Sequence, residues 1–283
     1  MTKQLALIGA SVLQSPSPAM HKAALAALGL DWDYRAVAVG RGQLPSRWAQ
    51  LSRGFQGLNV TTPHKEQAFR LVDEVTAEAA MARSVNTVVF AGGRSLGATT
   101  DGRGFLAALA LGARAKPSRA VILGSGGAAR SVALALLQTG CEVVILARRP
   151  AAAREIAADL AEAGLGPVPS AELDAGAVSR ELSSSDLLVN ATTLGSGQMR
   201  DRCPLPLEVS LPAALTVFDL VYSQTPTPLL RWAERCGCRA MSGLEMLVQQ
   251  AALSFQLWTG IQPPVELMRS AAQGALGRLG SPL

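Results

Sequence analysis

The amino-acid sequence predicts an α/β fold with mainly parallel sheets, and three observations support this. Apolar strand-like stretches alternate with helical segments along almost the whole chain, as in βαβ architectures. The composition, with 49% hydrophobic and 17% charged residues, is that of a globular protein. The 283 residues are enough for one large or two medium domains, since domains run to about 100–200 residues.

The first part of the chain contains strands, helices and a hairpin. Strands are expected over 4–10, 32–39 and 57–62, and helices within 15–30, 65–75 and 104–111. Residues 85–102 are predicted to be two strands around Gly92-Gly93. Pro18 suits the first position of a helix, so Ser17 is expected to be the N-cap of the helix within 15–30.

The character of the sequence changes at Lys116-Pro117-Ser118. Residues 119–149 are predicted to form a strand, a glycine turn, a helix and a second strand, which is a βαβ unit of the usual length. The other expected elements are strands over 186–193 and 215–222, a loop with three prolines over 195–212, and helices from Gly243 onward.

Charge and hydropathy narrow the functional class. The formal net charge is +5 and the sequence pI about 9.4, but the longest arginine run is Arg148-Arg149, so a nucleic-acid partner is not expected. An anionic small molecule explains the charge as well. No apolar run reaches the roughly 18 residues of a membrane span, and the N-terminus lacks a signal-peptide layout. A cytoplasmic protein with no membrane partner is therefore expected.

The four cysteines do not form a metal-binding pattern. They lack C-x-x-C spacing, and neither histidine lies near them; they are Cys141, Cys203, Cys236 and Cys238. We therefore expect no metal and no disulfide.

Residues 124–129 match the dinucleotide-binding pattern G-x-G-x-x-G/A, with Ala129 in the third place. The match follows the apolar strand "AVILG" and opens a helix, which is the context that the pattern requires. Gly124 makes the tight turn, Gly126 lets the backbone approach a pyrophosphate, and the helix N-terminus attracts the phosphates. The alternative is a close-packed corner without a ligand.

The end of the second strand of this unit indicates which dinucleotide binds. An NAD site usually has an Asp or Glu there, about 20 residues after the glycines. Here the strand ends in Ala147, Arg148 and Arg149. Guanidinium groups suit a 2′-phosphate and can stack on adenine, so NADP is predicted over NAD. The alternative is two solvated surface arginines.

Taken together, nine stretches resemble the shikimate dehydrogenase family, in the family's order, across essentially the whole chain. They are SPSP (15–18), NVTTPHK (59–65), SVNT (84–87), TTDG (99–102), GSGGAAR (124–130), NAT (190–192), DLVY (219–222), TPLL (227–230) and GLEMLVQQA (243–251). Each string alone is modest, but nine in sequence on one chain are highly specific.

The resemblance implies a fold of two domains and an activity. A substrate-binding α/β domain would comprise residues 1–103, completed by C-terminal helices over 243–283, and a Rossmann-like NADP-binding domain would comprise 104–242. The active site would lie in the cleft between them. The implied activity is reversible NADPH-dependent reduction of 3-dehydroshikimate to shikimate, a step of aromatic amino-acid biosynthesis. The sequence leaves monomer and homodimer open.

By resemblance, Lys65 is the catalytic lysine and Asp101 its partner. A nearby ammonium can stabilise the negative charge that forms on a carbonyl oxygen during reduction, and can supply its proton. Asp101 would hold Lys65 by a charge-assisted hydrogen bond and bind an adjacent substrate hydroxyl. Without the shared pattern, Lys65 would be interpreted as a surface lysine and Asp101 as a turn residue.

Six further residues resemble the family's substrate contacts: Ser15, Ser17, Thr61, Asn86, Tyr222 and Gln250. Ser15 and Ser17 would bind the substrate carboxylate, which agrees with the affinity of helix N-termini for anions. The neutral side chains of Thr61, Asn86 and Gln250 suit ring hydroxyls, because those groups both donate and accept. Tyr222 can equally be a core residue.

The predicted cofactor contacts extend beyond the glycine turn. Met246 can equally be a residue of helix packing. The full set is Gly124, Ser125, Gly126, Gly127, Ala128, Ala147, Arg148, Arg149, Asn190, Thr192, Gly243 and Met246.

Two positions qualify the resemblance. His64 occupies the variable place of N-V-T-x-P-x-K, so it is expected to pack or to start a helix. Thr99 stands where the family usually has Asn, which leaves the substrate less certain than the reaction. The alternatives are a quinate/shikimate dehydrogenase or a related paralogue, and a Rossmann-type NADP-binding regulator without turnover. The presence of Lys65 and Asp101 argues against the regulator.

Overall fold

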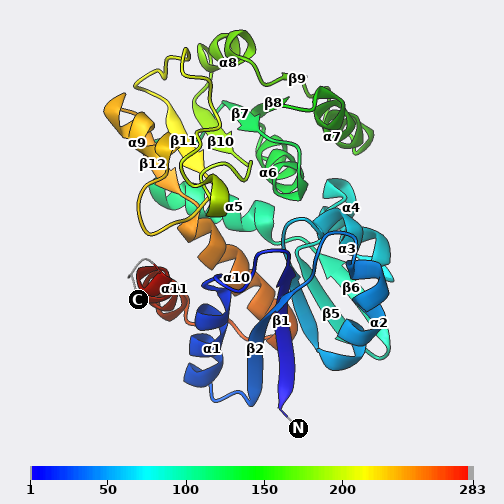
Figure 1. Cartoon of the computed structure of the whole chain (residues 1–283). Helices are drawn as coiled ribbons and strands as arrows, with labels where there is room; N and C mark the ends of the chain where they lie inside the picture. The colour runs from blue at the N-terminus through cyan, green and yellow to red at the C-terminus, as the bar shows by residue number, and fades with distance from the viewer. Residues whose placement is uncertain (1, 280–283) are drawn as a thin grey trace. The chain divides into compact units, whose positions relative to one another are not determined.

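The computed structural model describes residues 2–279, which fold into two compact units (Figure 1). Unit 1 comprises Met1–Gly104 and Leu247–Leu283, and unit 2 comprises Phe105–Met246. Each unit has its own six-stranded sheet with helices against it, so the predicted α/β class is confirmed. The first and last parts of the chain thus share one unit.

The sheet of unit 1 has the strand order β2-β1-β3-β5-β6-β4. Its strands are β1 (Lys3–Gly9), β2 (Trp32–Ala38), β3 (Gly57–Val60), β4 (Glu74–Val75), β5 (Thr87–Ala91) and β6 (Arg94–Ala98). β1 runs parallel to both β2 and β3, whereas β5 is antiparallel to β3 and to β6. The ends of β1, β3 and β6 and the start of β5 therefore lie at one edge of the sheet.

The β5–β6 hairpin is the one predicted around Gly92-Gly93. Both glycines have positive φ, 58° and 78°, which is the backbone that a two-residue hairpin turn requires. The turn sets the register, with Thr87 opposite Ala98. This register brings Asn86, just before β5, beside the segment that follows β6.

The helices of unit 1 differ from prediction in several details, and the helix over residues 77–82 was not predicted. The helices are α1 (Ser17–Ala27), α2 (Leu44–Gly54), α3 (Lys65–Leu71), α4 (Ala77–Ala82), and parts of α5 (Asp101–Gly112) and α10 (Leu244–Thr259), with α11 (Val265–Leu279). α1 begins one residue early, so Ser17 is not its N-cap. α3 ends at Leu71 rather than near 75, because β4 forms there and pairs with β6. The sequence did not predict α2, which begins with Pro45 in its first turn.

The core of unit 1 lies between the sheet and its helices. Apolar side chains of neighbouring strands share one face; they include Ile8, Leu58, Val60 and Val88, with Leu44, Leu51 and Ala68 from the helices. All are buried, so α2 and α3 pack on the inner strands β1, β3 and β5.

The sheet of unit 2 is wholly parallel, with the order β12-β11-β10-β7-β8-β9. Its strands are β7 (Arg119–Leu123), β8 (Glu142–Ala147), β9 (Ser170–Glu172), β10 (Leu187–Asn190), β11 (Thr216–Asp219) and β12 (Arg239–Ser242). Counted from β7, this is the order 3-2-1-4-5-6 of dinucleotide-binding folds. The strand order reverses between β7 and β10, and ligands of such sheets bind outside the carboxyl ends at that point.

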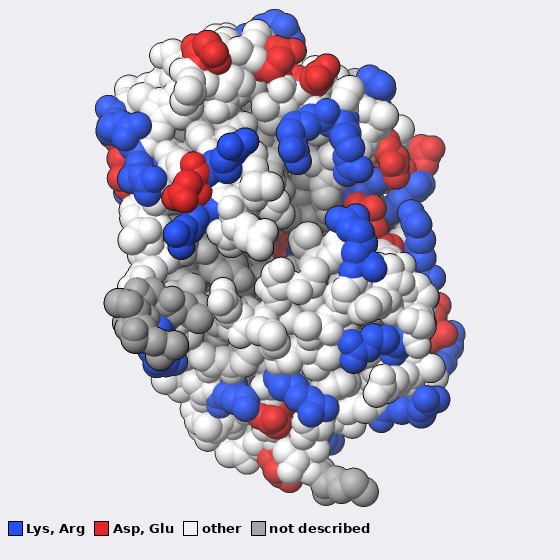
Figure 2. All heavy atoms as spheres, in the orientation of Figure 1, with Lys and Arg blue, Asp and Glu red and all other residues white. Residues whose placement is uncertain are grey.

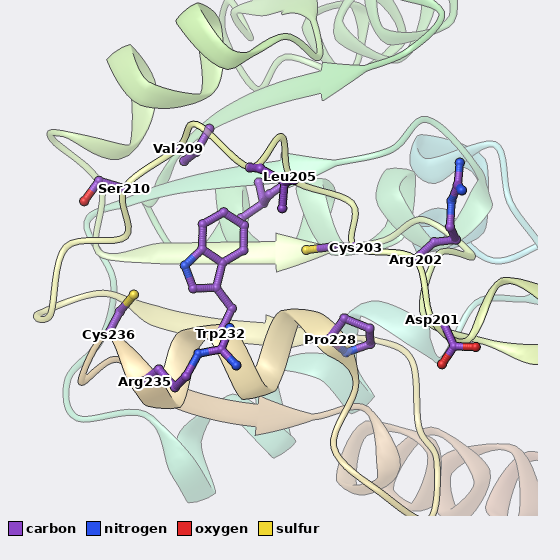
Figure 3. A pocket seen from close by; sticks show the side chains of 11 residues that line it. Asp201, Arg202, Cys203, Leu205, Val209, Ser210, Pro228, Trp232, Arg235 and Cys236 are labelled. Atoms are coloured by element: carbon purple, nitrogen blue, oxygen red, sulfur yellow. The ribbon is translucent and has the colours of Figure 1, made fainter.

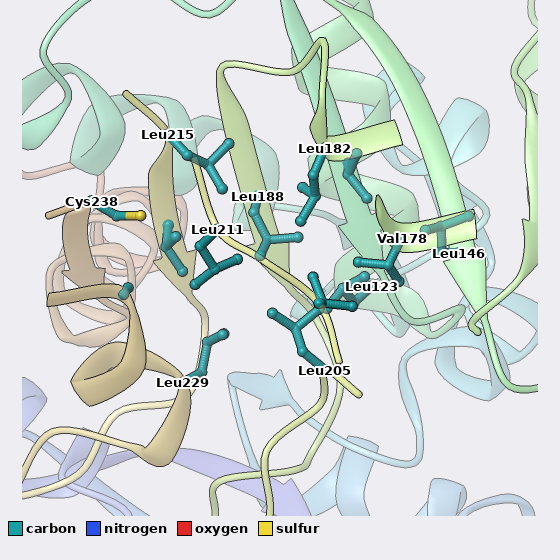
Figure 4. Close-up of a cluster of buried hydrophobic side chains, with 14 of the residues drawn as sticks. Leu123, Leu146, Val178, Leu182, Leu188, Leu205, Leu211, Leu215, Leu229 and Cys238 are labelled. Atoms are coloured by element: carbon teal, nitrogen blue, oxygen red, sulfur yellow. The ribbon is translucent and has the colours of Figure 1, made fainter. Parts of the chain in front are cut away.

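Branched apolar residues fill one face of this sheet (Figure 4). Leu123, Leu146 and Leu188 from the strands meet Val178 of α8 and Leu229 of α9. The helices of unit 2 are α6 (Gly127–Gln138), α7 (Pro150–Glu162), α8 (Ala175–Leu182) and α9 (Pro228–Arg235), with a 3-10 turn η1 (Gly197–Met199). Of these, the sequence predicted only α6. The observed η1 lies in the segment that was predicted to be a loop.

Surface charge is dispersed. Lys and Arg side chains are spread over the face seen in Figure 2, with Asp and Glu between them. Within residues 2–279, no helix is both long and apolar enough to cross a membrane.

Candidate active site

Lys65 and Asp101 form an ion pair in unit 1. Lys65 is the first residue of α3 and Asp101 the first residue of α5, so the two side chains extend from two helix starts at the same edge of the sheet. The Lys65 ammonium donates to Asp101 Oδ2. Their side chains are only 13% and 5% exposed, so water screens this pair less than a surface pair.

Asn86 connects this ion pair to Thr100, just before α5, and to Gln250 of α10. Its Nδ2 donates to Asp101 Oδ1 at 2.9 Å and to Gln250 Oε1 at 3.1 Å. The backbone N–H of Thr100 donates to Asn86 Oδ1 at 2.8 Å. Since a backbone N–H can only donate, this bond fixes which end of the Asn86 amide is the oxygen.

Thr100 is a site residue that the sequence reasoning missed. Its Oγ1 lies 2.8 Å from Asn86 Nδ2 and donates to Gln250 Oε1 at 3.4 Å. Its position directly before Asp101 was the available signal. Thr99, the departure from the family pattern, is buried beside it at the end of β6.

Gln250 is held against the start of α5 by a close approach of two helices. A Cβ added to Gly104 would lie 2.6 Å from Gln250 Cβ and 2.7 Å from its backbone nitrogen. Only glycine therefore permits this contact. Gln250 Nε2 donates to the carbonyl of Leu247 at 2.8 Å, which leaves Oε1 directed to Asn86.

Ser15 and Ser17 lie together at the start of α1. The hydroxyl of Ser15 accepts from the Ser17 backbone N–H at 3.2 Å and lies 3.1 Å from Ser17 Oγ. Ser15, and not Ser17, therefore satisfies an N–H of the first turn. Two adjacent hydroxyls beside a helix N-terminus provide donors for a carboxylate.

Thr61 and His64 belong to the turn between β3 and α3. Thr61 lies against Gly9, where an added Cβ would lie 2.5 Å from Thr61 Cγ2, so the ends of β1 and β3 are tightly packed. His64 is buried, and its Nε2 lies 2.8 Å from the carbonyl oxygen of Val39. A carbonyl only accepts, so His64 donates to it and fixes the turn.

The glycine turn of unit 2 fits a pyrophosphate. Gly124 has a φ of +114°, and its Cβ position lies 3.0 Å from the carbonyl oxygen of Ala191, at the point where the strand order reverses. A Cβ on Gly126 would meet nothing within 4 Å, so the backbone there is open to a ligand. Gly126 is also the N-cap of α6, whose first N–H groups suit phosphate oxygens.

Ala147, Arg148 and Arg149 lie at the carboxyl end of β8, next to β7. Ala147 is buried as the last residue of the strand, and both arginines are exposed. Arg149 is the N-cap residue of α7. The guanidinium groups are therefore free to reach a phosphate on the side of the sheet where dinucleotides bind.

Asn190 and Thr192 have structural partners. Asn190 is buried, with its Oδ1 accepting from the backbone N–H of Thr192 at 3.0 Å and from its hydroxyl at 2.7 Å. Its Nδ2 donates to Asp219 at 2.8 Å. Burial raises the pKa of Asp219, and donors from Thr227, the Val221 N–H and Asn190 oppose that shift. Asp219 thus shapes the carboxyl edge, a role that the sequence reasoning did not assign.

Tyr222, Gly243 and Met246 also lie in unit 2. Tyr222 is half-buried after β11, and Met246 is buried on α10. Gly243 packs against the backbone of Leu220, since an added Cβ would lie 2.1 Å from that carbonyl oxygen. Their contact with a ligand stays a prediction.

A separate cavity of about 720 Å³ lies between α9 and the loop before β11 (Figure 3). Its wall includes Leu205, Trp232 and Cys203. Burial raises the pKa of the Cys203 thiol, which disfavours the reactive thiolate. Among the described residues that line it, none was predicted for catalysis, substrate or cofactor. Within residues 2–279 there is also no group of three or more metal-ligating side chains.

Comparisons with known proteins agree with the geometry. A family model described as "Shikimate dehydrogenase substrate binding domain" matches residues 7–88, and one described as "Shikimate 5'-dehydrogenase C-terminal domain" matches residues 243–273. Shikimate dehydrogenase (NADP(+)) of Moorella thermoacetica is 44% identical over 280 residues, covering 98% of this chain and 94% of that protein.

Solved structures are similar over nearly the whole chain. Shikimate 5-dehydrogenase from Thermus thermophilus, in complex with NADP(H) and shikimate, has a TM-score of 0.86 at 38% identity, covering 97% of this chain and 100% of that one. Quinate dehydrogenase from Corynebacterium glutamicum, in complex with NAD, has a TM-score of 0.84 at 32% identity, covering 95% and 98%.

Proposed function

This chain belongs to the shikimate dehydrogenase family, and we propose that it catalyses the reversible NADPH-dependent reduction of 3-dehydroshikimate to shikimate. The observation that carries the proposal is the ion pair of Lys65 and Asp101, held by Asn86 beside Gln250. A site that combines a controlled ammonium with neutral amide side chains suits a carbonyl group on a ring that bears hydroxyls.

In the proposed reduction, Lys65 is the proton donor. Its Nζ stabilises the developing negative charge on the substrate oxygen and donates a proton to it, so the carbonyl becomes a hydroxyl. In the oxidation, neutral Lys65 takes the proton back. Asp101 aims the ammonium through Oδ2, while Asn86 holds Oδ1. The proton on Lys65 is replaced from water after each reduction.

The remaining substrate contacts are proposed from their placement in unit 1. Ser15 and Ser17 would bind the carboxylate through their hydroxyls and the start of α1. Thr61, Asn86 and Gln250 would bond the ring hydroxyls, because each offers neutral donor and acceptor groups. The domain of residues 1–103, completed by residues 243–283, would thus bind the substrate; it corresponds closely to unit 1. Tyr222 stays a predicted contact.

We propose that the domain of residues 104–242, which corresponds closely to unit 2, holds NADP. The turn at Gly124–Gly127 offers the open backbone for the pyrophosphate, and Arg148 with Arg149 would bind the 2′-phosphate. NADPH supplies the hydride when bound. The other proposed cofactor contacts are Ser125, Ala128, Ala147, Asn190, Thr192, Gly243 and Met246. Because Asn190 is fully buried, we propose that it acts by holding Thr192.

Quinate is the less supported substrate. The curated relatives at about 40% identity are named shikimate dehydrogenase (NADP(+)), whereas the quinate dehydrogenase is 32% identical. Quinate carries one more hydroxyl at the carboxylate-bearing carbon, so the two substrates would differ next to Ser15 and Ser17.

The test is oxidation of shikimate and quinate with NADP and with NAD, by the wild type and by Lys65→Ala. We expect a preference for shikimate and NADP, and a kcat for Lys65→Ala lower by orders of magnitude with little change in the KM for shikimate. A near-normal kcat in Lys65→Ala would contradict its role. Equal kcat/KM with NADP and NAD would contradict the assignment of Arg148 and Arg149.

A further inference from the structure

A pair of buried hydroxyls lies beside Asn86. They belong to Thr87, the first residue of β5, and Ser254 on α10, and both residues are fully buried. Their oxygens are 2.7 Å apart. Thr87 Oγ1 also donates to Asn86 Oδ1 at 2.9 Å. We call these two residues the hydroxyl pair.

Asn59 fixes the direction of this arrangement. Its Nδ2 donates to the backbone carbonyl of Asn86 at 3.2 Å and to Ser254 Oγ at 3.0 Å, while Tyr34 donates to its Oδ1 at 2.8 Å. Because a carbonyl only accepts, the amide of Asn59 can point only one way. Asn59 Nδ2 therefore donates to Ser254 Oγ, and Thr87 Oγ1 donates to Asn86 Oδ1. The one hydrogen of Ser254 faces two acceptors, Thr87 Oγ1 at 2.7 Å and the carbonyl oxygen of Gln250 at 3.0 Å.

The proton count on Asn86 shows why a second donor to Oδ1 matters. Its Nδ2 has two hydrogens but faces three acceptor oxygens, on Asp101, Thr100 and Gln250. The Asn86 amide can donate to both Asp101 Oδ1 and Gln250 Oε1 only while the orientation of its plane is fixed. Thr100 N–H and Thr87 Oγ1 hold Oδ1 from two directions.

We propose that Thr87 and Ser254 are positioning residues, which lock the Asn86 amide so that it faces Asp101 and Gln250 at once. The hydroxyl pair also joins β5 to α10, and Ser254 lies one helical turn after Gln250, whose carbonyl oxygen is 3.0 Å from the Ser254 hydroxyl. The pair thereby sets Gln250 relative to Asn86. This inference rests on the proposed function for its kinetic consequence, and on hydrogen-bond geometry alone for the orientation of Asn86.

The kinetic test compares Thr87→Val, which removes the hydroxyl and keeps the shape, with Thr87→Ser, which keeps the hydroxyl. For Thr87→Val we expect KM and the equilibrium Kd for shikimate to rise about threefold to tenfold, the size expected for loss of one hydrogen bond. Thr87→Ser should stay within about twofold of the wild type. Thr216→Val, a buried threonine at the start of β11 in unit 2, serves as the matched control and should leave both constants unchanged.

A double-mutant cycle tests whether the pair acts as one. Ser254→Ala alone should raise KM in the same direction, and the double variant with Thr87→Val should be little worse than Thr87→Val, because both remove the same contact between the two hydroxyls. Ser254→Ala also carries the test if Thr87→Val fails to fold, since alanine favours a helix. Unchanged KM and Kd in the folded variants, or strictly additive effects, would overturn the proposal.

A measurement without turnover separates this inference from the proposed function. The side-chain NH₂ signals of Asn86 in ¹⁵N-labelled protein, assigned with Asn86→Ala, report its orientation directly. We expect them to shift and exchange faster with solvent in Thr87→Val but not in Thr87→Ser. If the wild type fails to turn over shikimate, the proposed function fails, and these signals still decide the inference. Signals that are identical in Thr87→Val and the wild type refute it.

Discussion

The buried histidine His21 makes the stability of unit 1 depend on pH. A single substitution that removes its titrating ring can measure this contribution. Its ring stacks on Tyr34, with centroids 4.2 Å apart and an interplanar angle of 15°, and Trp258 lies 5.4 Å away. Complete burial lowers the pKa of His21 from 6.5 to about 3, with the Asn59 side chain opposing the shift. The native protein therefore keeps this ring neutral where an unfolded chain would protonate it.

The sign and size of the effect follow from the two pKa values. Between about pH 6.5 and pH 3 the unfolded chain binds a proton that native His21 refuses, so stability falls as the pH falls through this window. Each pH unit costs about 1.4 kcal/mol. Lowering the pH to about 4.5 should thus cost about 3 kcal/mol through His21 alone. Above about pH 6.5 the contribution is fully present.

The perturbation is His21→Phe, which keeps a flat ring against Tyr34 and removes the titrating group. Urea unfolding at about pH 7.5 and about pH 4.5 gives the loss of unfolding free energy for each protein. The loss should be smaller in His21→Phe by about 3 kcal/mol, because every other titrating group is shared. Equal losses in both proteins would refute the reasoning.

Three further predictions concern single side chains. His64→Leu should keep most of the kcat but lower the free energy of unfolding by about 1–3 kcal/mol, because a buried carbonyl loses its donor. Kinetics measures the kcat and urea unfolding measures the stability of the same sample. A loss of kcat comparable to that of Lys65→Ala would contradict this prediction. Gly104→Ala should raise the KM for shikimate more than it lowers kcat, because the new Cβ pushes on Gln250; an unchanged KM counts against the close approach. Arg130→Met should lower the free energy of unfolding by about 3–5 kcal/mol, because it leaves the buried carboxylate of Asp159 on α7 without its partner. Denaturant unfolding measures this loss, and a change below about 1 kcal/mol would exclude a structural ion pair.

Local patterns in the sequence were enough for part of the site. The pair Gly92-Gly93 predicted the hairpin, because only residues that accept positive φ can form such a turn. The glycine pattern and its flanking strand and helix predicted the turn at Gly124. The pattern N-V-T-x-P-x-K separated Lys65 from His64, and the structure places His64 in a buried structural contact.

Other features escaped the sequence because they depend on neighbours in space. The prediction of Ser17 as N-cap was wrong by one position, since Pro16 is the N-cap and Ser17 is the first residue of the helix. The helix predicted to about residue 75 was cut short by β4, whose pairing partner β6 lies some 20 residues further along the chain. Asp219 was quoted as part of a motif, but only its buried contacts show what it does.

What the sequence by itself determined was the class of fold and the glycine turn, and it predicted Lys65 and Asp101 as the reacting pair, because each rests on residues close together in the chain or on an ordered set of motifs. What the tertiary structure decided was the arrangement around Asn86. Its partner Gln250 is 164 residues away, and Ser254 lies 167 residues from Thr87. Sequence periodicity records which face of an element is buried, but not which distant side chain it meets there. These contacts are made by the antiparallel register of β3 with β5 and by the packing of α10 on Gly104.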